Sequence, residues 1–101
     1  MITLEQLRTE FKPQILALAA QQGVEDISVF GSVARGDQDE DSDVDFLVKM
    51  KPGCGLWEMG GLLYHLQELL KTEVQITDRE SVEENAFPDE KEHIFSEAVQ
   101  L

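Results

Sequence analysis

The chain has 101 residues, and 21 acidic against 8 basic residues give it a net charge of −13. This length and a hydrophobic content of 42% predict a single domain, residues 1–101, with one modest core. The few basic residues are scattered, which argues against nucleic-acid binding and leaves a basic protein partner, or solubility alone, to explain the acidity. No apolar run is long enough for a membrane span, and the N-terminus has no signal-peptide pattern. The single cysteine, Cys54, cannot form an internal disulfide, so a reducing cytoplasm is expected.

Apolar periodicity and turn residues predict an alternation of helices and strands along the chain. The expected elements are a helix opened by a Thr3–Gln6 capping box and interrupted at Pro13, a strand over 26–30, a helical turn over 32–35, a strand over 43–49, a helix over 56–71, a strand over 73–77, a turn opened by a Ser81–Glu84 capping box, and a helix starting at Pro88. This order predicts an α/β (α+β) fold with a three-stranded mixed sheet and helices packed on one face. The long crossover between the last two strands favours a parallel pair, whereas the direction of the first strand stays open. Trp57 is expected to anchor the packing of the long helix.

Two acids, Asp43 and Asp45, interrupt an otherwise apolar strand. Because side chains alternate along a strand, Val44 and Phe46 can face a core while the two acids share the other face. Neighbouring carboxylates repel each other unless a cation lies between them, and oxygen ligands favour magnesium or calcium. The pair therefore predicts a divalent-metal site.

A small turn, Gly31-Ser32, directly follows the first expected strand. Turns of this kind expose backbone amides that can hold a phosphate, so the turn and the acids together indicate metal-assisted chemistry on a nucleoside triphosphate. The acidic segment 37–42 is interpreted as a solvated loop. A calcium loop is disfavoured because Ser42 and Val48 stand where glycine and glutamate are required, and the lysine of a P-loop is absent.

The motif GSVARG and the motif DSDVDFLV, with Ser32 and Asp43 separated by ten residues, resemble the signature of the DNA polymerase beta-like nucleotidyltransferase superfamily. The segment LVKMKPGCGLWEMGGLLYHLQELLKTEVQIT and the terminal EHIFSEAVQL are similar to the minimal nucleotidyltransferases, or MNT proteins. This resemblance covers nearly the whole chain and implies the small nucleotidyltransferase fold. It also implies an antitoxin that forms a hetero-oligomer with a HEPN toxin and transfers AMP from ATP onto a toxin hydroxyl, a tyrosine in some members.

The resemblance also implies roles for individual residues. Gly31 and Ser32 would hold the triphosphate, and Asp43 and Asp45 would be the catalytic acids that bind two Mg²⁺ ions. Arg35 would contact phosphate or pair with nearby acids, and pairing is the preferred interpretation.

One position departs from the family pattern. The third carboxylate expected on the last strand is replaced by Gln75, which offers a metal no charge. Glu73 lies two residues earlier on the same strand face and is an alternative acid. Three hypotheses follow: a protein adenylyltransferase, a weakened binding module that neutralises the toxin by complex formation alone, and, least favoured, a transferase for a small molecule.

Overall fold

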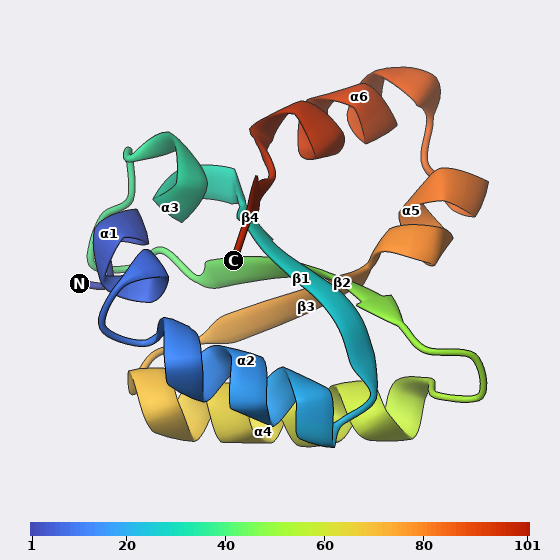
Figure 1. Ribbon diagram of the computed structural model, residues 1–101. Helices are drawn as coiled ribbons and strands as arrows, with labels where there is room; N and C mark the ends of the chain where they lie inside the picture. The colour runs from blue at the N-terminus through green and yellow to red at the C-terminus, as the bar shows by residue number, and fades with distance from the viewer.

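Four strands and six helices alternate along the chain in the computed structural model, which describes residues 1–101 (Figure 1). The elements are α1 (Leu4–Arg8), α2 (Lys12–Gln21), β1 (Val24–Phe30), α3 (Gly31–Arg35), β2 (Val44–Met50), α4 (Leu56–Leu70), β3 (Val74–Asp78), α5 (Arg79–Asn85), α6 (Pro88–Glu97) and β4 (Val99–Gln100). No helix combines the length and the apolar character that crossing a bilayer requires.

The N-terminal helices form as their sequence predicts. The Thr3 hydroxyl accepts a hydrogen bond from the Gln6 N–H at 3.1 Å, and the Gln6 side chain accepts one from the Thr3 N–H at 2.9 Å. This reciprocal pair confirms the capping box. Pro13 lies in the first turn of α2, where its missing N–H leaves no hydrogen bond unmade. The predicted interruption therefore divides the segment into two helices.

The sheet has the strand order β3-β2-β1-β4. Strands β2 and β3 are parallel, which confirms the prediction, and β1 pairs with β2 in the antiparallel direction that the sequence left open. The end of β1 therefore lies beside the start of β2, with Phe30 opposite Asp45. This register brings the turn after β1 next to the acids of β2.

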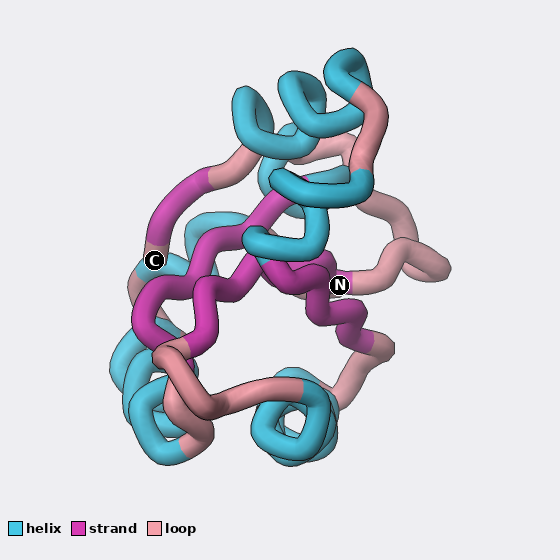
Figure 2. The backbone as a smooth tube through the Cα atoms, turned by 90° about the vertical axis from the view of Figure 1, so that its right-hand side faces the viewer, coloured by secondary structure: helices cyan, strands magenta, loops and turns pink.

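Helices lie on both faces of the sheet. Helices α2 and α4 lie side by side beneath one face and enclose the main core, in which Val29, Phe46 and Leu62 have no exposed surface (Figures 1 and 2). Helices α5 and α6 lie over the opposite face, where Leu47 of β2 and Val82 of α5 are buried. Leu47 is an apolar residue on the face that carries the acids, and helices α5 and α6 shield it from solvent.

The predicted α+β class with a mixed sheet is thus confirmed, with two differences. Helices were expected on one face of the sheet only, but α2 and α4 pack on one face while α5 and α6 lie over the other. The sheet also has a fourth strand, β4, whose residues Val99 and Gln100 pair with Val29 and Ser28 of β1. Two residues are too few to produce a recognisable alternation, which is why the sequence predicts three strands.

Two local predictions were wrong. Helix α5 begins at Arg79, because the Asp78 carboxylate caps it by accepting a hydrogen bond from the Glu80 N–H at 3.2 Å, so Ser81 does not open it. Trp57 does not anchor packing: the residue is 90% exposed, and α4 buries Leu62, Leu66 and Leu70 instead.

Candidate functional site

The glycine turn and the acidic pair meet where β1 ends and β2 begins. Gly31 has a positive φ of +78°, and a Cβ atom at this position would lie 2.5 Å from Asp45 Oδ2. A side chain would therefore be strained by the backbone conformation and would also collide with the carboxylate. Glycine is required here because the backbone passes so close to an acid.

Helix α3 presents the turn toward the acids. Its first N–H groups have no partner within the helix, and Ser32, its second residue, is half-buried. The helix ends after one turn at Gly36, whose φ is +83°. The predicted phosphate turn is therefore the start of a short helix that faces the acidic edge.

The acids of β2 lie beside Gln75 of β3. The Gln75 Nε2 group donates a hydrogen bond to Asp43 Oδ2 at 2.8 Å, and Gln75 pairs with Asp45 in the strand register. No third histidine, cysteine or carboxylate joins Asp43 and Asp45 in a group able to hold a metal ion, so the alternative acid Glu73 does not complete the site. The structure therefore brings the predicted acids together with the neutral residue that replaces the third one.

Electrostatics penalise the ionised form of Asp45. Partial burial is the largest cause that raises its pKa above the ordinary value, and the negative charges of Asp43 and Glu97 add to it, while Arg35 acts in the opposite direction. A divalent cation between Asp43 and Asp45 would relieve this repulsion. The oxygen donors and their charge therefore suit Mg²⁺.

Arg35 is engaged by two carboxylates. Its Nε lies 3.1 Å from Asp37 Oδ2 and its Nη1 lies 2.8 Å from Glu97 Oε1, and both hydrogen bonds raise the pKa of Arg35. This arrangement agrees with the preferred interpretation of Arg35 as a paired residue.

Glu97 is the site residue that sequence reasoning missed. Besides Arg35, it accepts a hydrogen bond from the Gly31 N–H at 3.3 Å, and His93 Nε2 lies 3.0 Å from its Oε1. The partner of Gly31 lies 66 residues away in the chain, so no local pattern could have identified it. The only signal was its place in the terminal segment EHIFSEAVQL that carries the MNT resemblance.

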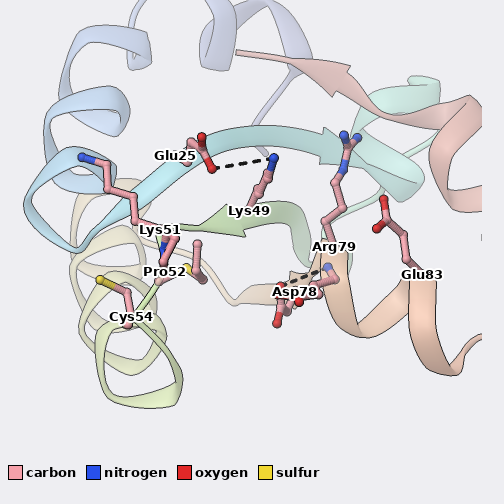
Figure 3. Close-up of a pocket in the computed structure, with 11 residues that line it drawn as sticks. Glu25, Lys49, Lys51, Pro52, Cys54, Asp78, Arg79 and Glu83 are labelled. Carbon is pink, nitrogen blue, oxygen red and sulfur yellow. Dashed lines mark hydrogen bonds and ion pairs between the residues drawn. The ribbon is translucent and has the colours of Figure 1, made fainter.

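A separate pocket lies at the opposite end of β2, away from these residues. It has a volume of about 630 Å³ and lies between the 50–54 loop and the start of α5 (Figure 3). Lys49 and Arg79 project on the same side of the sheet, and Lys49 lies 3.7 Å from Glu25 (Figure 3). Arg79 also stacks over the Phe95 ring at 5.1 Å. None of the predicted site residues lines this pocket, and two of its three cations, Lys49 and Arg79, already have partners.

Helix α4 carries exposed apolar residues on the side that faces away from the sheet. Leu56, Trp57 and Tyr64 are 84%, 90% and 61% exposed. Gly60 lies between them, with open space around it and no neighbour within 4 Å of the position a Cβ would take. We refer to these four residues as the α4 surface.

Comparisons with known proteins agree with this geometry. A model of the nucleotidyltransferase domain family matches residues 5–101. The protein adenylyltransferase MntA of Thermococcus cleftensis is 35% identical over 82 residues, covering 81% of this chain and 83% of that protein.

Solved structures share the fold. A structure assigned to a minimal nucleotidyltransferase superposes with a TM-score of 0.80 at 36% identity and covers 99% of this chain and 97% of that one. A chain of the complex between a tri-AMPylated Shewanella oneidensis HEPN toxin and an MNT antitoxin superposes with a TM-score of 0.65 at 18% identity. That match covers 92% of this chain and 70% of the other, and it shows likeness of fold alone.

Proposed function

Because the chain belongs to the nucleotidyltransferase domain family, we propose that residues 1–101 form a single-domain enzyme that transfers AMP from ATP onto a partner protein. The acceptor is a tyrosine hydroxyl of a HEPN-type toxin in the cytoplasm, and the modification neutralises the toxin. The similarity to a protein adenylyltransferase and to a chain of a toxin–antitoxin complex supports this proposal. The observation that carries it is the meeting of the Gly31 turn with the Asp43–Asp45 pair at one end of the sheet.

Each site residue has a distinct task in this proposal. Gly31 and Ser32 bind the triphosphate through the N–H groups at the start of α3 and the Ser32 hydroxyl. Asp43 and Asp45 would hold two Mg²⁺ ions, and the charge of such ions would stabilise both the entering and the leaving oxygen of the displacement. The tyrosine oxygen forms the new bond to the α-phosphorus and gives up its proton to water, and pyrophosphate departs with the electron pair of the broken bond between the α-phosphorus and the bridging oxygen.

Gln75 favours a second candidate function. Its amide donates to Asp43 and adds no negative charge to the site, so metal binding is weaker than with a third acid. If transfer is lost for this reason, the protein would be a nucleotidyltransferase-like module that neutralises the toxin by binding alone. Nucleotide binding survives in both candidate functions.

The α4 surface and the acidity of the chain support a protein partner. Trp and Tyr are the side chains that most often contribute large binding energies at interfaces. Between Leu56 and Leu70, α4 has Glu58 and Glu68 but no lysine or arginine, which favours a partner whose apolar patch has a basic rim. A second copy of this chain fits less well, because each copy carries a net charge of −13. We propose that this surface docks the toxin.

Growth of cells that express the toxin distinguishes the two candidate functions. We expect native protein to restore growth and Asp43→Asn, which removes one metal-binding charge, to fail while still co-purifying with the toxin. Restored growth with Asp43→Asn would support neutralisation by binding alone. If the native protein neither restores growth nor co-purifies with the toxin, both candidate functions are wrong.

A further inference from the structure

One carboxylate from the C-terminal helix contacts two of the groups that the proposed function assigns to the nucleotide. Glu97 Oε2 accepts a hydrogen bond from the Gly31 N–H at 3.3 Å, and Glu97 Oε1 lies 2.8 Å from Arg35 Nη1. The Glu97 side chain is only 12% exposed, so water competes little for these contacts. Glu97 is thus an anion held at the start of α3.

A phosphate oxygen bound to the same amide would need the same space. A hydrogen bond from an N–H group places the acceptor oxygen about 2.7–3.2 Å from the nitrogen. A phosphate oxygen at that distance would lie in the space next to the Gly31 nitrogen that Glu97 Oε2 occupies at 3.3 Å, and the negative charges of the two groups would repel each other. Glu97 must therefore move away before the Gly31 amide can bind a phosphate.

We propose that Glu97 is an internal competitor of the nucleotide, which covers Gly31 and Arg35 in the free protein and leaves both when Mg-ATP binds. This inference rests on the proposed function, because it takes the Gly31 turn to be the triphosphate site. When Glu97 leaves, Arg35 keeps Asp37 as one partner and gains a free donor face for phosphate. The movement of Glu97 thus frees the Gly31 N–H and makes the Arg35 guanidinium available to the phosphate.

Helix α6, which carries Glu97, has no buried residue, and only its C-terminal end is anchored on the sheet. The segment that follows it is held on β1 by the two residue pairs of β4, by the Leu101 N–H, which donates to the Ile27 carbonyl at 3.1 Å, and by Gln100 Nε2, which donates to Asp26 Oδ1 at 2.7 Å. Apart from the Glu97 contacts, its side-chain attachment to the rest of the fold includes the Phe95 ring beneath Arg79. Loss of the Glu97 contacts on nucleotide binding would therefore loosen α6 while its C-terminal end stays on β1, so amide exchange in α6 should depend on whether nucleotide is bound.

Titration calorimetry with Mg-ATP tests the competition. We expect Glu97→Gln, which removes the charge but preserves the shape, to bind Mg-ATP on the order of tenfold more tightly than the native protein. Glu92→Gln removes a charge from an exposed position of the same helix and controls for net charge. Asp37→Asn removes the other partner of Arg35 without touching Gly31 and controls for the release of the arginine.

The outcomes separate this inference from the proposed function. Tighter binding by Glu97→Gln than by either control supports the competition. Unchanged or weaker binding by Glu97→Gln, with the native protein still binding Mg-ATP, overturns the competition and leaves the proposed function standing. Absence of Mg-ATP binding by every protein overturns both.

Hydrogen exchange of the native protein supplies a readout that a purely structural Glu97 would not change. We expect Mg-ATP to increase amide exchange in residues 88–97 while it protects the start of α3. In Glu97→Gln, exchange in residues 88–97 should already be fast without nucleotide. Uniform protection of both segments by Mg-ATP in the native protein would overturn the inference.

Discussion

Gln75 donates a hydrogen bond from Nε2 to Asp43 Oδ2 at 2.8 Å, across the parallel pair formed by β2 and β3. The bond holds Asp43 in place and satisfies one of its oxygens without a cation. Gln75 also lies beside Asp45 in the register, where an acid would add a third negative charge. The site therefore combines two acids that repel each other with Gln75, which adds no negative charge and stabilises Asp43 by a hydrogen bond when no metal is bound.

Gln75→Asp should convert the pair into a three-carboxylate site. We expect Mg²⁺ affinity and AMP transfer to rise on the order of tenfold, because ligand charge strengthens binding of hard cations. Without metal the variant should melt at a lower temperature than the native protein, because three acids repel. Magnesium titrations followed by thermal melting measure both effects. Gln75→Asn, which shortens the side chain without adding charge, is the matched control, and equal behaviour of the two variants would contradict the prediction.

Gly31→Ala should damage the site more than Gly36→Ala, although both glycines have similar positive φ values of +78° and +83°. An alanine in this conformation costs about 1–2 kcal/mol at either position. Only at Gly31 does the new Cβ also meet a carboxylate, Asp45, whereas Gly36 has open space. Chemical denaturation should show a larger loss of stability for Gly31→Ala, and Mg-ATP binding should be lost in that variant alone. Equal losses in the two variants would show that Asp45 is not in contact with the turn.

The two halves of the candidate site differ in how far sequence could predict them. The Gly31 turn and the acids are visible because a strand alternates with period two, and charged residues within an apolar strand stand out. Glu97 could not be predicted as a site residue from the sequence, because its contacts depend on how α6 folds back over the sheet. The position of Trp57 was predicted wrongly for a different reason: helical spacing shows that α4 is amphipathic but not which stripe faces the core. The Ser81–Glu84 pattern misled because Asp78 caps the helix earlier.

Asp45→Asn should stabilise the metal-free protein at neutral pH. Because the folded state raises the pKa of Asp45 above the ordinary value of 3.8, the folded protein holds this proton more tightly than the unfolded chain. The stability of the native protein should therefore fall as the pH rises from the ordinary pKa of Asp45 in the unfolded chain to its raised pKa in the folded protein. Asparagine does not ionise, so Asp45→Asn should not lose stability in this way. In melting curves recorded with a chelator, the melting temperature of Asp45→Asn should be higher than that of the native protein at pH 7. The difference in melting temperature should disappear well below pH 4. A variant that is less stable at pH 7 would contradict the assigned repulsion.

Trp57→Ala and Tyr64→Ala should weaken the proposed complex with a toxin while leaving the fold intact. Truncation of a buried aromatic residue at an interface costs on the order of 2 kcal/mol, which is about 30-fold in Kd. Both side chains are exposed in the free chain, so the melting temperature should hardly change. Surface plasmon resonance with the partner measures the affinity. Phe87→Ala, an exposed aromatic residue between α5 and α6, is the control, and equal losses at Phe87 and Trp57 would argue against a specific α4 surface.

Assignment of this site to AMP transfer can be tested with ATP that carries a labelled α-phosphate. The native protein, Asp43→Asn and Gln75→Asp are each incubated with Mg²⁺, labelled ATP and the co-purified partner. We expect label on the partner with the native protein, none with Asp43→Asn, and more with Gln75→Asp. Label with Gln75→Asp alone would mean that the natural protein acts by binding. No label with either the native protein or Gln75→Asp would contradict the assignment of this site to AMP transfer.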